Sequence, residues 1–151
     1  MRQAAGRSLC PLLFLLLAGT LSASPLAEQL TLAGDNVAQL RQALDAVADD
    51  ERAGMEFLIA NMPERDLRAL SSEYLLENVR LAYRAWREAP WHMQVSESLF
   101  LNNVLPYASI NERRDRWRGK FFSKLKPLVK DAKSPGEAAA ILNNKIFKLL
   151  N

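Results

Sequence analysis

The chain has 151 residues and a mass of 17.0 kDa, and its 49% hydrophobic and 25% charged residues are typical of a folded globular protein. A single cysteine and a single histidine exclude a disulfide scaffold and any metal site built from several cysteines or histidines. A net charge of +3 would suggest a nucleic-acid binder. Two of these positive charges lie in the N-terminal segment, however, and the rest of the chain is almost neutral.

The first 24 residues have the pattern of a secretory signal peptide. Arg2 and Arg7 supply positive charge, an apolar stretch runs from Leu9 to Leu21, and small residues follow at 22–24. The apolar stretch is shorter than the roughly 20 residues that cross a bilayer. We therefore expect an exported chain, periplasmic or extracellular, without stable membrane insertion after cleavage. A retained transmembrane anchor is the alternative, because Leu21 stands where the peptidase prefers a small residue.

Cleavage near Ser24 removes Cys10, so the mature chain has no thiol to act as a nucleophile or to form a disulfide. His92 is then the only residue through which a Ser/His/Asp triad could form. We therefore assign no catalytic residue, no cofactor and no metal to this chain.

Charge is distributed unevenly along the mature chain. Fourteen acidic residues and seven arginines lie between Glu28 and Glu112, whereas eleven basic and three acidic residues lie between Arg113 and Lys148. The basic half could attract an anionic polymer or lipid. We favour the simpler interpretation that acidic and basic helices pack side by side in one domain. No nucleic-acid partner is expected, because an exported protein rarely meets nucleic acid.

Apolar residues recur with helical spacing and no segment has the pattern of a strand, which predicts an all-α fold, a multi-helix bundle of about five to seven helices. We expect a linker at 25–34 and a helical domain over 35–151. Asp35 or Asn36 is the expected cap of a first helix, and Asp49 and Asp50 are expected to cap a second that ends at Pro63. Their buried stripes are Val37, Leu40, Leu44 and Val47, then Met55, Leu58, Ile59 and Met62. Residues 63–70 are expected to be a polar connection with at most a short helical turn.

The strongest helical pattern starts at Ser71 or Ser72 and must stop before Pro90. Ser96 is expected to cap a short helix that Pro106 ends. Two helices follow, whose buried stripes are Trp117, Phe121, Leu125 and Leu128, then Ala138, Leu142, Ile146 and Leu149. Pro127 either kinks the first of these or opens a separate helix. Ser134, Pro135 and Glu137 form a capping box at the start of the last.

One aromatic cluster is a candidate site for binding, or for contact with another domain: Trp86, Trp91, His92, Tyr107, Asn111 and Glu112. These residues could line a groove for a peptide or glycan. The structural interpretation, which we favour, makes Trp91 a plug between helices, His92 a turn residue, and Asn111 with Glu112 a helix-capping pair. Asp115 among its neighbouring arginines is interpreted as part of a surface ion network.

The spacing of tryptophan, proline and tyrosine in this region carries a family resemblance. The residues are Ala89-Pro90-Trp91, Val95-Ser96, Leu99-Phe100, Val104-Leu105-Pro106-Tyr107, Asn111-Glu112 and Trp117-Arg118, followed by Lys126 to Lys130 and Ser134-Pro135. This pattern resembles the helical region that precedes the catalytic core in bacterial secreted transglutaminase-like proteins, which belong to the papain-like superfamily. The resemblance covers about Gly54 to Asn151 and includes no catalytic motif.

The resemblance implies a cysteine nucleophile, a histidine base and an aspartate orienter on a downstream core of helix and sheet. Cys10 and His92 do not match those positions. The chain is therefore expected to be the non-catalytic N-terminal helical part of a longer protein, which packs on that core or shapes access to it. The core, and with it a peptide or protein substrate, would be its partners. This hypothesis predicts an exposed apolar face at Ile146, Leu149 and Leu150. The alternative is a stand-alone exported helical module that binds a partner through its basic C-terminal half.

Overall fold

The computed structural model describes residues 24–109 and 112–150, and side chains only as far as residue 146. Within this part of the chain every regular element is a helix, which confirms the predicted all-α bundle. The described residues form eight α-helices, where the sequence predicted about five to seven. Two of them are single turns, and one forms in the segment expected to be a linker. Of the predicted signal peptide, only its last residue, Ser24, is among the described residues.

Helix α1 (Pro25–Leu32) occupies most of the segment 25–34. The Ser24 hydroxyl accepts a 3.3 Å hydrogen bond from the N–H of Ala27, and proline takes the first helical position, where its missing N–H costs nothing. Leu26 and Leu30 lie one turn apart and pack on the core. The linker prediction was therefore wrong, because these two leucines hold a two-turn helix against its neighbours.

Helices α2 (Val37–Ala46) and α3 (Arg52–Asn61) pack against each other as a hairpin. Seven of the eight residues in the predicted apolar stripes are buried, namely Leu40, Leu44, Val47, Met55, Leu58, Ile59 and Met62. The eighth, Val37, is partly buried and packs against the core. The predicted cap at Asn36 is wrong in its chemistry. Its side-chain amide donates to the carbonyls of Leu67 and Leu70, at 2.8 and 2.9 Å, and so ties the start of α2 to a distant segment.

The acidic residues before α3 also do not cap it. Asp50 and Glu51 accept hydrogen bonds of 2.8 and 2.9 Å from the guanidinium of Arg87, near the end of α5 (Ser72–Glu88). Glu51 is buried. These carboxylates hold two helices together, a role that a pattern of local spacing does not reveal.

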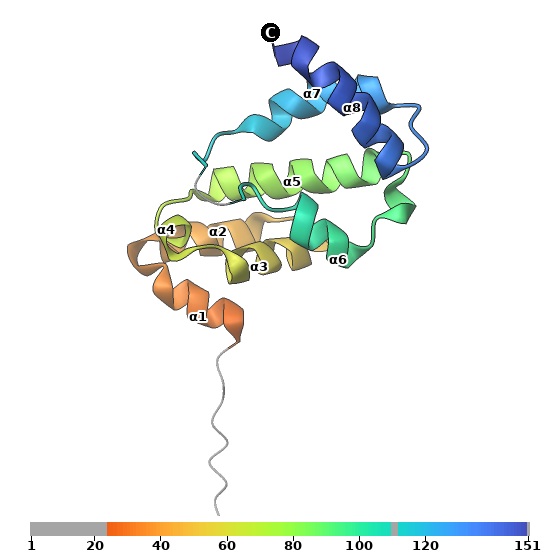
Figure 1. The fold of residues 1–151 in the computed structure, drawn as a ribbon. Coiled ribbons are helices and arrows are strands. Elements are labelled where there is room, and N and C mark those ends of the chain that lie inside the picture. The colour runs from red at the N-terminus through yellow and green to blue at the C-terminus, as the bar shows by residue number, and fades with distance from the viewer. Residues whose placement is uncertain (1–23, 110–111, 151) are drawn as a thin grey trace, which may run out of the picture.

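Helix α4 (Glu64–Leu67) is a single turn, and α5 (Ser72–Glu88) is the central helix of the fold. The Ser71 hydroxyl caps α5 by accepting a hydrogen bond of 3.2 Å from the N–H of Tyr74, and the helix ends before Pro90, as predicted. Figure 1 shows α5 between two layers, with α1 to α4 and α6 (Glu97–Leu99) on one side and α7 (Trp117–Val129) and α8 (Pro135–Leu150) on the other.

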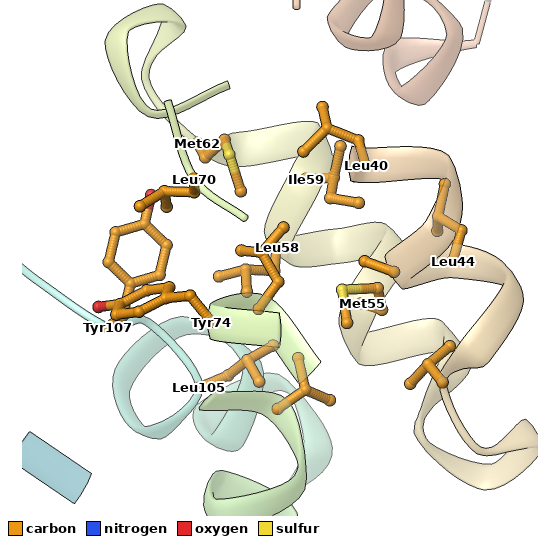
Figure 2. Close-up of a cluster of buried hydrophobic side chains, with 14 of the residues drawn as sticks. Leu40, Leu44, Met55, Leu58, Ile59, Met62, Leu70, Tyr74, Leu105 and Tyr107 are labelled. Carbon is orange, nitrogen blue, oxygen red and sulfur yellow. The ribbon is translucent and has the colours of Figure 1, made fainter. Parts of the chain in front are cut away.

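The hydrophobic core lies on the first of these two sides. Helix α6 (Glu97–Leu99) starts at the predicted cap Ser96 and continues as a π-helical turn over Phe100–Val104. Phe100 and Leu105 are fully buried. Figure 2 shows Leu105, Tyr74 and Tyr107 meeting the apolar side chains of α2 and α3.

Helices α7 (Trp117–Val129) and α8 (Pro135–Leu150) form a second hairpin. Pro127 lies inside α7, so one helix runs through it. The Ser134 hydroxyl accepts a hydrogen bond from the N–H of Glu137 at 3.2 Å, and the Glu137 carboxylate accepts one from the N–H of Lys133 at 2.8 Å. This confirms the capping box, except that Glu137 bonds to the residue before the cap and not to Ser134 itself.

Candidate functional site

An apolar groove of about 310 Å³ lies between α5 and α7, a volume at the lower end of ordinary ligand pockets. One wall comes from α5 and the turn after it: Leu81, Ala85, Ala89, Pro90 and Trp91. The other wall comes from α7: Trp117, Phe121, Phe122, Leu125 and Val129. No residue of α7 is fully buried, and Trp117 is 37% exposed. Three residues of the predicted α7 stripe, Trp117, Phe121 and Leu125, therefore face α5 across a space that the described residues leave unfilled. The fourth, Leu128, does not line the groove.

Charged side chains frame one end of this groove. Lys126 of α7 forms an ion pair with Glu88 of α5, and Glu88 also accepts a 2.8 Å hydrogen bond from Arg84. These two bonds keep the pKa of the Glu88 carboxyl below its usual range. Arg84 and Lys126 also lie over the ring of Phe122, 4.8 and 5.4 Å from its centroid. The ion pair and the ring contacts join α5 to α7 at the rim, while the floor of the groove stays apolar.

Arg118 fastens the start of α7 to the core. Its guanidinium donates to the side chain of Asn78 on α5, at 2.5 Å, and to three consecutive carbonyls at 104–106, at 2.5 to 3.0 Å. Burial lowers the pKa of Arg118 to about 10, which leaves it charged at neutral pH. Asn78 donates in turn to the carbonyl of Leu105, at 2.9 Å. Carbonyls at the end of the π-helical turn are thus satisfied by a residue of another helix.

A second buried polar cluster joins α4 to the segment before α7. Asp66 is 2% exposed, and its Oδ2 accepts hydrogen bonds from the hydroxyl of Tyr107 at 2.9 Å and from Nε and Nη2 of Arg114 at 2.9 and 2.7 Å. Burial alone raises the pKa of Asp66, but the bonds from Arg114 and Tyr107 outweigh it and hold the pKa of this carboxyl below its usual value. Burial and the bond to Asp66 raise the pKa of Tyr107.

The five residues of the predicted site that the structure describes do not gather in one place, although Tyr107 and Glu112 line the same pocket. Trp86 packs on the core side of α5, stacked on Phe100 with ring centroids 4.3 Å apart, and its indole N–H donates to the carbonyl of Val95. Tyr107 is buried beside Asp66. Both side chains are held by contacts within the domain, and of the five candidate residues that the structure describes only Trp91 lines the α5/α7 groove.

Two of the remaining three, His92 and Glu112, lie away from the groove. His92 is exposed, and its Nδ1 lies 3.2 Å from the carbonyl of Ala89, as expected of a turn residue. Glu112 is exposed and its carboxylate accepts from the N–H of Ser109 at 3.1 Å. Asn111 lies outside the described residues. The position of His92 fits the favoured interpretation of a turn residue. Trp91 lines an open groove, so its interpretation as a plug between helices stays a prediction. The helix-capping interpretation fails for Glu112, because α7 begins at Trp117 with Arg116 at its cap position.

The arrangement offers contact surface and no reactive centre among the described residues. His92 has no nucleophile or carboxylate bonded to its ring there. The described residues contain no group of three acidic, histidine or cysteine side chains placed to bind a metal ion. No helix in this part of the chain is long and apolar enough to span a membrane.

Comparisons with known protein families, with curated proteins and with solved structures found no match to this chain. The resemblance to transglutaminase-like proteins therefore stays a prediction. The functional argument rests on the geometry of the chain itself.

Sequence reasoning missed the structural roles of the buried Asp66 and of the partly buried Arg114 and Arg118. Asp66 was counted in a polar connection, and Arg114 in a surface ion network around Asp115. Of the ion network predicted around Asp115, the described residues show the exposed pair with Arg113, at 2.8 Å. Arg114 instead pairs with the buried Asp66. A search for apolar periodicity does not find such residues, because a buried arginine and an exposed one look alike in a sequence.

Proposed function

We propose that this chain is the non-catalytic N-terminal helical domain of an exported transglutaminase-like protein, which packs against a catalytic core and shapes access to it. The signal-like N-terminus supports export to the periplasm or beyond. The absence of a thiol in the predicted mature sequence supports a non-catalytic role, because the nucleophile of this superfamily is a cysteine thiolate.

The observation that carries the proposal is the open α5/α7 groove. Helix α7 presents tryptophan, phenylalanine and leucine side chains toward α5, and none of them is fully buried. Apolar side chains gathered around an open groove are a common feature of surfaces that contact a protein, a ligand or a membrane. A protein partner is the occupant that this proposal supplies. If a neighbouring core covers the α7/α8 hairpin, the apolar side chains of α7 are buried in the whole protein. This explains why they face the groove.

The distribution of ion pairs favours this proposal over the stand-alone basic module. Arg114 forms an ion pair with Asp66, and Arg116 forms ion pairs with Glu73 and Glu77 at 2.8 and 2.9 Å. The guanidinium of Arg118 donates its hydrogen bonds to backbone carbonyls of the core. Much of the positive charge at the start of the basic half is therefore neutralised within the domain. Less of it is left to attract an anionic partner.

The predicted apolar face of α8 supports the proposal only in part. Ala138 is buried, and Leu142 and Ile146 are partly exposed. The side chains of Leu149 and Leu150 lie outside the described residues, so that part of the expectation stays a prediction.

The test starts from the nucleotide sequence after the codon for Asn151. We expect an open frame that encodes a cysteine, a histidine and an aspartate on a core of helix and sheet. The protein from that frame should unfold in one cooperative transition, at a higher temperature than residues 24–151 alone. Residues 24–151 alone should cleave or join no amide. A stop codon directly after Asn151, or amidase activity of the pure segment, would contradict the proposal.

A further inference from the structure

We infer that the α5/α7 groove is the docking site for the core, and that the core inserts one or two large apolar side chains there beside a carboxylate that pairs with Lys130. This inference rests on the proposed function and names the chemistry of the contact. It follows from the volume of the groove, the residues of its walls and the charge at its rim.

The volume decides the kind of occupant. An α-helix with its side chains is about 10–12 Å across, so a groove of about 310 Å³ is too small to enclose one. It is large enough for one or two bulky apolar side chains. The walls carry Trp91 near one end and Trp117 near the other, and buried anchors set among aromatic side chains are the usual energetic centre of a protein interface.

The rim decides the charge of the occupant. Four charged residues line the groove, and only Glu88 is acidic. Glu88 is already paired with Lys126, and Arg118 is already bonded to carbonyls of the core. Lys130 is exposed and has no ion pair among the described residues. A partner that seats an apolar anchor in the groove therefore gains most by placing a carboxylate beside Lys130.

The experiment measures amide hydrogen exchange in the protein from the full reading frame and in residues 24–151. Docking at the groove predicts slower exchange over the C-terminal half of α5 and over α7 in the full protein. Lys130→Glu in the full protein should speed exchange there about two- to fivefold, the size of a rim ion pair. The matched control is Lys124→Glu, an exposed lysine of α7 that does not line the groove, and it should leave exchange unchanged.

A second variant tests the anchor without depending on charge. Ala85 lines the groove and is half-buried, so Ala85→Phe fills the space from within. We expect it to leave residues 24–151 folded and to abolish the extra protection in the full protein. Ala139→Phe, at an exposed position of α8, is the control.

The outcomes separate the two claims. Protection that arises only outside the groove would overturn this inference and leave the proposed function standing. If residues 24–151 exchanged equally fast in the full protein and alone, and the core folded without them, both this inference and the proposed function would be overturned. Equal effects of the two lysine variants would overturn the pairing of a carboxylate with Lys130.

Discussion

The hydroxyl of Tyr107 donates a 2.9 Å hydrogen bond to Oδ2 of Asp66, 41 residues earlier in the chain, and both side chains are buried. The same oxygen accepts two bonds from Arg114. This cluster fixes the segment between α6 and α7 to α4. Because α7 follows directly, the cluster also sets where α7 starts, and with it one wall of the groove.

Tyr107→Phe keeps the buried ring and removes only its hydroxyl. We expect a loss of about 1.5–3 kcal/mol in the free energy of unfolding, the range for a hydrogen bond to a charged group. Tyr74→Phe is the matched control, because its ring packs edge-on to Tyr107 and the structure gives its hydroxyl no hydrogen bond within the described residues. Urea unfolding of residues 24–151 measures both, and equal losses would contradict the role of the Tyr107–Asp66 bond.

Asp66→Asn leaves the partly buried Arg114 without its counter-ion, and we expect a loss of about 3 kcal/mol at neutral pH. The pKa of Asp66 is lowered in the folded state, so the ionised carboxylate stabilises the fold above its unfolded pKa of about 4, and that stability is lost as pH falls through the lower folded value. The difference between wild type and variant should therefore be constant above about pH 5 and shrink below about pH 4. Urea titrations across this range measure it, and a difference that grows toward acid would refute the assignment.

Gly54→Ala should destabilise the chain although alanine is the better helix former. A Cβ at this position would lie 2.6 Å from Cε2 and 2.7 Å from the hydroxyl oxygen of Tyr83, whose ring is buried against Phe100. We expect a net loss of about 1–2 kcal/mol, since overpacking outweighs the gain in helix propensity. Gly119→Ala in α7 is the control, because its nearest neighbour is 3.7 Å away, and it should gain up to about 1 kcal/mol. Thermal unfolding compares the two variants. A Gly54→Ala protein more stable than wild type would contradict this prediction, because it would show that the Tyr83 side chain can move away at little cost.

Arg118→Met removes the donor to the carbonyls at 104–106 while keeping an apolar stem of similar length. We expect a loss of about 2–3 kcal/mol, because buried acceptors are left unpaired, and faster hydrogen exchange at the start of α7. Arg113→Met, at a side chain that is 87% exposed, should change stability by less than about 0.5 kcal/mol. If Arg118→Met lost no more stability than Arg113→Met, the conclusion that Arg118 holds the start of α7 against the core would be contradicted.

The helices were predictable where apolar spacing and caps agree. Met55, Leu58 and Ile59 are buried as expected, and the hydroxyls of Ser71 and Ser96 cap the helices that they precede. Spacing and capping are local properties, so one sequence contains them. Helix α1 was missed because it is short and its apolar face consists of two leucines in a stretch that otherwise resembles a linker.

The candidate site was less predictable because its parts come together only in three dimensions. Trp91 was singled out from the sequence and does line the groove, whereas Trp86, five residues earlier, packs on the opposite side of α5. The partner wall depends on where α7 docks, and that depends on Arg114 and Arg118 finding buried partners far away in the chain. No local pattern encodes those long-range bonds.

The most direct measurement is the binding of a hydrophobic fluorescent dye to residues 24–151, with oligomeric state and thermal unfolding followed on the same sample. Our account predicts a folded helical protein that binds the dye, and a clear loss of that binding in Ala85→Phe but not in Ala139→Phe. A cooperative, monomeric protein that binds no dye would contradict it, because its α5/α7 groove would then need no partner.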